Sequence, residues 1–335
     1  MRQPVLGLSL VAVLAACAPA RAFDCAKAGS PVERAICADP AAKAADAAME
    51  VAFNRLRDGI AGENRRAALD DQRAWLKDRN TRCAEKGAGQ GAAQGAGQPA
   101  GQGTAMTRCL AEADAARTRV LTGQAQAGPP LERRPVPVFV RQAGARDKVA
   151  VAVRVYRFPD PADPLERTVN AEADKALAAI PYKPEDPDGP GTWGYEELWT
   201  IAYATPRLIS IKRDTWEFTG GAHGTSGTLG LTVDAAGRIL TFPDLFAKPV
   251  AADFAALCLK TIKAARAEKG GEAEPDPALL KKIAPVVADL RNWVFTGAGA
   301  TVYFDPYSVG PYAEGAYECP LPAALLDRAA RIPLR

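Results

Sequence analysis

The chain of 335 residues contains a single histidine, His223, and this limits the chemistry that its side chains can perform. A Ser-His-Asp triad would have to use His223, but no Gly-x-Ser-x-Gly turn presents a nucleophilic serine. Catalytic zinc usually requires two or three histidines, and neither a phosphate-binding loop nor a Gly-x-Gly-x-x-Gly turn after a strand is found. We therefore predict a protein that is not an enzyme and that binds no metal or cofactor. A hydrolase with carboxylates far apart in the chain ranks last among the hypotheses.

A glycine-rich segment, residues 218–224 (FTGGAHG), directly follows a predicted strand. Its glycines, Gly220, Gly221 and Gly224, allow positive φ or a close approach to another segment. His223 could contact a bound partner, or its ring could tie the turn to a neighbouring carbonyl. The second role is favoured, because a lone histidine without partner residues in view is usually structural.

A second segment, residues 304–315 (FDPYSVGPYAEG), holds two prolines, two glycines and two tyrosines after another predicted strand. Stiff loops with tyrosines make good binding surfaces, because they lose little conformational entropy on binding. The alternative is an ordinary hairpin in which the two tyrosines lie flat on the sheet, and the sequence leaves both open. Across the two segments we predict seven partner-binding residues: Gly220, Gly221, His223, Gly224, Tyr307, Tyr312 and Glu314.

Residues 1–22 have the pattern of a bacterial signal peptide, with Arg2 before an apolar stretch that is too short to span a bilayer. Residues 14–17 (LAAC) resemble a lipobox that would lipidate Cys17, whereas residues 20–22 (ARA) resemble an ordinary cleavage site. The lipobox is slightly favoured, because it follows the apolar stretch directly. We expect the protein in the periplasm, held at the outer membrane if Cys17 is lipidated, with no other contact to the membrane.

Net charge gives no indication of a nucleic-acid partner. The formal charge of the whole chain is +3. Removal of residues 1–22 takes away Arg2 and Arg21 and no acidic residue, which leaves +1. A nearly neutral chain lacks the basic surface that binds nucleic acid.

Six cysteines remain after Cys17, and an even number in an exported chain indicates disulfides. No Cys-x-x-Cys pair occurs, so neither a zinc site nor a redox centre is indicated. If each domain pairs its own cysteines, Cys258 must join Cys319. Proximity in sequence favours Cys25 with Cys37 and Cys83 with Cys109.

The first part of the mature chain, residues 23–123, is predicted to be a small all-α, disulfide-stapled domain. Ser30 and Glu33 form a capping box, and a stripe of apolar residues at spacings of three and four marks the next helix. Further helices are predicted at 63–79 and 107–121, with Trp75 as a core anchor. Residues 87–103 are rich in Gly and Gln and are predicted to be a flexible insertion.

Residues 124–137 are rich in Pro, Gly and Ala and are predicted to be a linker. Beyond them, apolar residues alternate with polar ones, which is typical of strands. We predict an α+β domain with a mainly antiparallel sheet at 138–335. The main predicted elements are strands at 149–156, 199–204, 207–218 and 229–233 and helices at 165–179 and 251–267.

The first domain resembles the LprI-like lysozyme inhibitors. The motifs that carry the resemblance are residues 23–25 (FDC), 30–37 (SPVERAIC), 72–79 (QRAWLKDR), Cys83 and 109–110 (CL). The resemblance covers roughly residues 23–121. It implies a helical domain that binds a lysozyme-type glycoside hydrolase.

The second domain resembles the extracellular domain of the lysozyme-sensing anti-sigma factor RsiV and the non-catalytic region of some peptidoglycan deacetylases. The resemblance rests on Asn170, residues 219–224, residues 244–246 as the start of a helix, and residues 306–315. Both resemblances imply a partner in or near the cell wall.

We therefore expect a non-catalytic envelope binding protein that binds and inhibits lysozyme-type muramidases. The alternative is a sensory or structural module that binds peptidoglycan or another envelope protein without inhibiting it.

Overall fold

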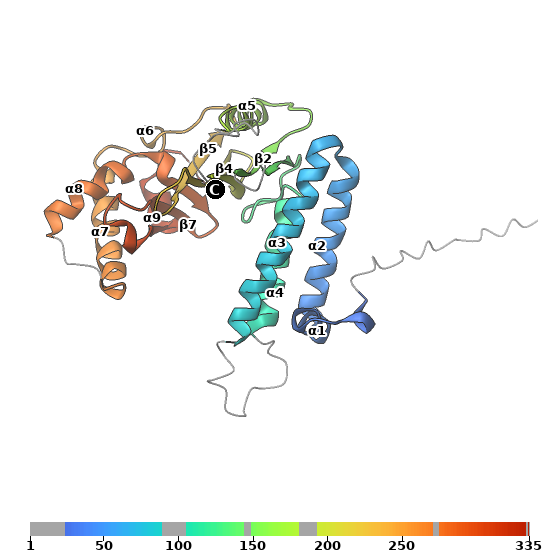
Figure 1. Cartoon of the computed structure of the whole chain (residues 1–335). Helices are drawn as coiled ribbons and strands as arrows, with labels where there is room; N and C mark the ends of the chain where they lie inside the picture. Colours follow the sequence, from blue (N-terminus) through green and yellow to red (C-terminus); the bar gives the residue numbers. More distant parts are fainter. Residues whose placement is uncertain are drawn as a thin grey trace, which may run out of the picture.

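The computed structural model describes residues 24–88, 105–143, 149–180, 193–270, 275–332 and 334. A helical module comes first, followed by two sheets with their own helices (Figure 1). Cys17, the rest of the predicted signal peptide and residues 89–103 of the predicted insertion lie outside the described residues.

The described residues of the helical module form four α-helices: α1 (Pro31–Ala38), α2 (Pro40–Gly59), α3 (Gly62–Ala88) and α4 (Ala105–Leu121). The predicted capping box begins α1: Ser30 Oγ accepts from the Glu33 amide at 3.1 Å, and the Glu33 carboxylate accepts from the Ser30 amide at 2.8 Å. The third helix is longer than predicted, since it continues through Cys83 to Ala88. In Figure 1, α2, α3 and α4 run side by side, with α1 at one end.

Five strands form the first sheet in the order β1-β2-β3-β4-β5. They are β1 (Val136–Ala143), β2 (Val149–Arg157), β3 (Trp193–Ala204), β4 (Leu208–Phe218) and β5 (Thr225–Asp234). All neighbours are antiparallel except β2 and β3, which are parallel and connected through α5 (Pro164–Ala178). Apolar residues from one face of this sheet and from α5 form a common core, which includes Val155, Val169, Trp199, Ile211 and Val233.

Three strands form the second sheet in the order β6-β7-β8. They are β6 (Trp293–Thr296), β7 (Gly299–Phe304) and β8 (Tyr317–Pro322), accompanied by α6 (Phe242–Leu245), α7 (Val250–Glu268), α8 (Asp276–Val287) and α9 (Ala323–Ala329). Their common core contains a buried aromatic cluster. In it, the rings of Phe254 and Trp293 are in edge-to-face contact, with 5.6 Å between centroids.

The three disulfides are Cys25–Cys37, Cys83–Cys109 and Cys258–Cys319, as predicted. The fold class is confirmed as well: a helical, disulfide-stapled module precedes an α+β part with mainly antiparallel sheets.

The sequence did not predict β1, β6 or α8, and two of the predicted boundaries are wrong. Residues 244–246 do not start a helix, because α6 begins at Phe242 and ends at Leu245, and Phe246 is already extended. The last two residues of the predicted linker belong to β1, which begins at Val136. The rest of that segment lies against the sheet, where the Gln126 amide donates to the Ile201 carbonyl at 2.8 Å.

Candidate functional site

The two loops singled out in the sequence lie against each other. The glycine-rich loop connects β4 to β5, and the tyrosine loop connects β7 to β8. Tyr312 donates its hydroxyl to the Gly224 carbonyl at 2.8 Å. The ring of His223 stacks on that of Tyr312, with 3.6 Å between centroids and 14° between planes. The structure therefore brings most of the predicted residues together at one surface.

The glycines of the first loop are required by the backbone. Gly220 and Gly221 have φ of 96° and 104°, which side-chain-bearing residues rarely adopt. At Gly224 the backbone closely approaches Trp216 and Glu217: a Cβ there would lie 2.4 Å from Trp216 Nε1 and 2.9 Å from the Glu217 carbonyl oxygen. Both uses of glycine expected from the sequence are therefore present.

His223 has the structural contact that the sequence favours. Its Nδ1 lies 3.1 Å from the Gly224 carbonyl oxygen, within its own turn. The residue is nevertheless exposed. Because the ring is already fixed by this contact and by stacking on Tyr312, it could meet a partner without losing much freedom. Contact with a partner stays a prediction.

Tyr307 lies at a position where glycine is the usual residue. The Ser308 amide donates to the Asp305 carbonyl at 3.0 Å and closes a four-residue turn with Pro306 and Tyr307 at its centre. Tyr307 has a φ of 72°, and it is the one non-glycine residue with positive φ in the described part of the chain. Proline followed by positive φ defines a type II turn, in which the third residue is normally Gly or Asn. Tyr307 is 64% exposed, so it does not lie flat on the sheet.

Glu314 holds the tyrosine loop onto α7. Its carboxylate lies 3.0 Å from Arg266 Nε and accepts from the Tyr317 hydroxyl at 2.7 Å. The hydrogen bond from Tyr317 and the charge of Arg266 lower the pKa of Glu314. Only 10% of the side chain is exposed, so its visible role is to position the loop. Its predicted contact with a partner is not tested.

Trp216 and Phe218, which the sequence analysis did not single out, lie beside these loops. They are two residues apart on β4, so their side chains point to the same face of the sheet. Their rings are 15° from parallel with 6.2 Å between centroids, and Trp216 is 37% exposed. The strand predicted at 207–218 contains both residues, and their spacing of two already places them on one face. The sequence did not show that this face lies outside the buried core at the end of the strand.

The helical module has a groove between α2 and α3 with a volume of about 410 Å³. Its apolar lining consists of Met49, Phe53, Leu69 and Leu76. Its polar lining consists of Asp46, Glu50, Asn54, Gln72 and Arg73. A concave, mostly apolar surface with polar residues around it is typical of a binding site.

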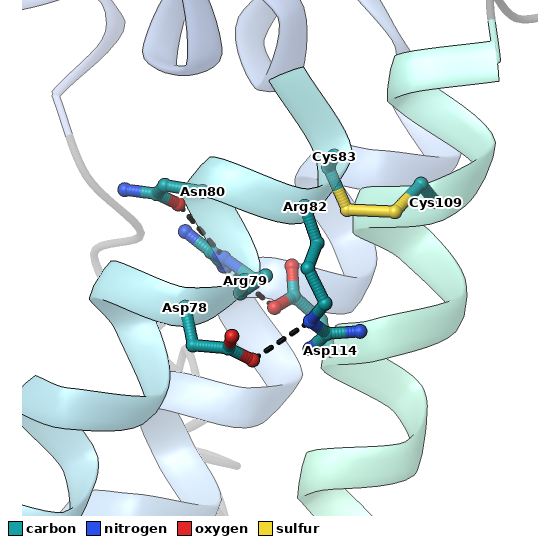
Figure 2. Close-up of a disulfide and its surroundings, with 7 residues drawn as sticks. All are labelled: Asp78, Arg79, Asn80, Arg82, Cys83, Cys109 and Asp114. Atoms are coloured by element: carbon teal, nitrogen blue, oxygen red, sulfur yellow. Dashed lines mark hydrogen bonds and ion pairs between the residues drawn. A yellow bond between two sulfur atoms is a disulfide. The ribbon is translucent and has the colours of Figure 1, made fainter. Parts of the chain in front are cut away.

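Buried ion pairs fix the helices around this groove. Arg79 of α3 reaches Asp46 of α2 at 3.0 Å and Asp114 of α4 at 2.5 Å. Figure 2 shows Arg79 directed at Asp114 next to the Cys83–Cys109 disulfide. Burial raises the pKa of Asp114 to about 6, although Arg79 acts to lower it.

Trp75 packs against the apolar cluster of the helical module, as predicted, but remains partly exposed. Two guanidinium groups lie over its ring, that of Arg79 at 5.4 Å and that of Arg117 at 5.2 Å from the ring centroid. These cation–π contacts connect the apolar cluster to the buried ion pairs.

Neither a metal site nor a membrane span is seen in the described part of the chain. No group of three or more His, Cys, Asp or Glu residues there is arranged to hold a metal ion. None of the helices described is long and apolar enough to cross a membrane.

Comparison with known proteins gives two family matches. Residues 25–121 match the family described as "Lysozyme inhibitor LprI", which spans the helical module from its first disulfide cysteine to the end of α4. Residues 243–324 match a family described as "Protein of unknown function (DUF3298)". The chain thus joins a helical module similar to lysozyme inhibitors to a module similar to DUF3298 proteins. No curated protein matches the chain.

The solved structures that are similar to the chain include two DUF3298 proteins. A DUF3298 family protein from Pseudomonas aeruginosa PAO1 is 17% identical, with a TM-score of 0.44, and the match covers 61% of this chain and 95% of that one. A member of the same family from Bacteroides fragilis NCTC 9343 is 18% identical, with a TM-score of 0.40 and coverages of 63% and 96%. The comparisons do not show the expected resemblance of the second domain to RsiV or to peptidoglycan deacetylases.

Proposed function

We propose that the mature protein is a non-catalytic binding protein of the bacterial envelope whose helical module binds and inhibits a lysozyme-type muramidase. The observation that carries the proposal is the match of residues 25–121 to a lysozyme-inhibitor family. The match covers all four helices of the module and both of its disulfides.

Location in the envelope is supported by the cysteines and by the leader. Three disulfides join the six cysteines of the described part of the chain, and disulfides persist in oxidising compartments such as the periplasm. The apolar leader has the length of a signal peptide, and either lipidation of Cys17 or cleavage after Ala22 would place the protein where muramidases attack the wall.

The groove between α2 and α3 is the part of the helical module best suited to contact the enzyme. It is concave, its lining helices are fixed by the Arg79 ion pairs, and α3 is tied to α4 by a disulfide. A preorganised surface of this kind loses little conformational entropy when a partner binds. The nearly neutral charge of the mature chain predicts an interaction that depends on fit more than on long-range attraction.

The test is a lytic assay with the oxidised mature protein and a lysozyme-type muramidase acting on cell-wall suspensions. We expect inhibition that saturates at an equimolar ratio, together with a complex on size-exclusion chromatography. Glu50→Arg and Asn54→Arg put a long charged side chain at the groove and should each weaken inhibition about tenfold, which corresponds to about 1.4 kcal/mol.

The matched control for Glu50→Arg is Glu112→Arg, which makes the same charge change at an exposed position of α4 outside the groove. It should inhibit like the unmodified protein. Full lytic activity in the presence of excess protein, with no complex, would defeat the proposal.

A further inference from the structure

We propose that the aromatic surface formed by Trp216, Phe218, His223, Tyr307 and Tyr312 binds a glycan strand of the cell wall, a chain of N-acetylated amino sugars. We call these five residues the aromatic ridge. The ridge lies outside the segment that matches the lysozyme inhibitors, so this inference does not depend on the proposed inhibition.

The five rings follow one another across three segments of the chain. Phe218 lies 6.2 Å from Trp216, and Trp216 Nε1 lies against Gly224. The Gly224 carbonyl accepts a hydrogen bond from the Tyr312 hydroxyl. The ring of Tyr312 stacks on that of His223 and lies 5.5 Å from that of Tyr307. The ridge therefore consists of two groups of rings, Trp216 with Phe218 and His223 with Tyr307 and Tyr312, that meet at Gly224.

Backbone strain at Tyr307 indicates that its side chain has a function. An L-residue in the left-handed region costs about 1–2 kcal/mol relative to ordinary conformations, and glycine would avoid the cost. The ring gains little from burial, since Tyr307 is 64% exposed. Strain without a compensating packing gain is typical of binding and catalytic positions.

Trp216 is fixed by two glycines in neighbouring strands and loops. A Cβ at Gly194 would lie 2.4 Å from Trp216 Cζ3, and a Cβ at Gly224 would lie 2.4 Å from its Nε1. The indole therefore lies directly against the backbone while 37% of the residue stays exposed. A large aromatic side chain held in this way offers contact area at low entropic cost.

The mixture of aromatic and polar groups favours a carbohydrate ligand. The negative face of an aromatic ring attracts the polarised C–H bonds on the flat face of a pyranose ring, just as it attracts the positive edge of another aromatic ring. Glu196 and Ser226 lie directly opposite Trp216 on the neighbouring strands, where a carboxylate and a hydroxyl can bond sugar hydroxyl and acetamido groups.

The ridge also stands out on the described surface. Four large hydrophobic side chains are exposed there, and two of them, Trp216 and Tyr307, belong to the ridge. The other two, Ile239 and Ile332, are aliphatic. An exposed aromatic cluster on an otherwise ordinary surface marks an interaction site.

Calorimetric titration of the full mature protein with the hexamer of N-acetylglucosamine, in the absence of any muramidase, tests the proposal. We expect saturable binding, and Trp216→Ala and Tyr307→Gly should each weaken it about fivefold or more. Tyr307→Gly is the sharper variant, because glycine fits the φ of 72° and the fold is kept. Ile239→Ala removes an exposed side chain away from the ridge and should bind like the unmodified protein.

Sedimentation with purified peptidoglycan sacculi distinguishes the glycan from other partners. The same two ridge variants should remain in the supernatant, while Glu50→Arg should sediment and lose only inhibition. No binding to the hexamer, or binding to sacculi that the ridge variants leave unchanged, would overturn the glycan proposal but leave the inhibitor proposal intact. Loss of muramidase inhibition in the ridge variants, with glycan binding retained, would show that the ridge docks the enzyme instead.

Discussion

At the scale of single residues, the aromatic ridge depends on close contacts between side chains and the backbone of neighbouring glycines. Gly224→Ala would place a Cβ 2.9 Å from the Glu217 carbonyl oxygen, a backbone atom that cannot rotate away. We expect a loss of roughly 1–3 kcal/mol of unfolding free energy, as in other overpacked sites, and a displaced Trp216. Thermal unfolding monitored by near-UV circular dichroism measures both.

Gly59→Ala is the control for Gly224→Ala, because nothing lies within 4 Å of a Cβ at that position near the end of α2. It should be neutral or slightly stabilising. Equal melting temperatures for the two variants would contradict the close approach at Gly224.

A buried carboxylate gives the helical module a pH dependence of its own. Burial raises the pKa of Asp114 from 3.8 to about 6, and its Oδ2 atom has no hydrogen-bond partner among the described residues. Since the folded state then binds the proton more tightly than the unfolded chain, this group adds stability as the pH falls from about 6 to about 4.

Asp114→Asn should remove that contribution. Relative to the variant, the unmodified protein should gain on the order of 1 kcal/mol between pH 6 and pH 4, measured by urea unfolding at each pH. A stability difference that does not change with pH would show that Asp114 stays ionised beside Arg79.

At the scale of helices and strands, the disulfides replace a large apolar core in the helical module. Its apolar clusters consist of few large side chains, including Met49, Leu56 and Leu110. Cys83 at the end of α3 is joined to Cys109 at the start of α4 across 26 residues. The module is thus stapled where its helices would otherwise separate.

Replacing Cys83 and Cys109 together by alanine should lower the unfolding free energy by about 3 kcal/mol, the value expected from loop-closure entropy. Alanine suits both positions because both are buried. Urea unfolding of the oxidised proteins gives the number, and an unchanged midpoint would mean that packing of α3 and α4 alone holds this end together.

Elements with local signals could be predicted, and those that depend on distant partners could not. The starts of α1 and α2 follow from Ser30 and Asp39, whose side chains cap the helix in the structure. The strand β1 was not predicted at all, and Pro137 at its start was assigned to the linker, although an edge strand tolerates proline. The meeting of the two loops was beyond prediction, since Gly224 and Tyr312 are 88 residues apart.

At the scale of the whole molecule, the helical module and the first sheet are joined through buried charges. Asp71 of α3 lies 2.7 Å from Arg117 of α4 and 3.3 Å from Arg141 of β1. Burial alone would raise the pKa of Asp71, but Arg117, Arg154 and Arg141 lower it, so the carboxylate stays ionised. The amide of Phe139 also donates to Asn64 of α3 at 2.9 Å. In Figure 1, α3 runs close to the first sheet.

Asp71→Ala would leave Arg117, which is 2% exposed, without its carboxylate. We expect a loss of about 3–5 kcal/mol and faster proteolytic cleavage within residues 124–135, measured by limited proteolysis. The adjacent Asp70→Ala breaks only an exposed pair with Arg73 and should cost less than about 1 kcal/mol. Equal effects of the two substitutions would refute the role of Asp71 as the junction.

The central claim, that the helical module is the muramidase-binding part, is tested most directly by amide hydrogen exchange of the mature protein with and without a lysozyme-type muramidase. We predict a stable complex in which α2 and α3, the helices that line the groove, exchange more slowly. Protection confined to residues 218–224 and 304–315, or unchanged exchange throughout the chain, would contradict it.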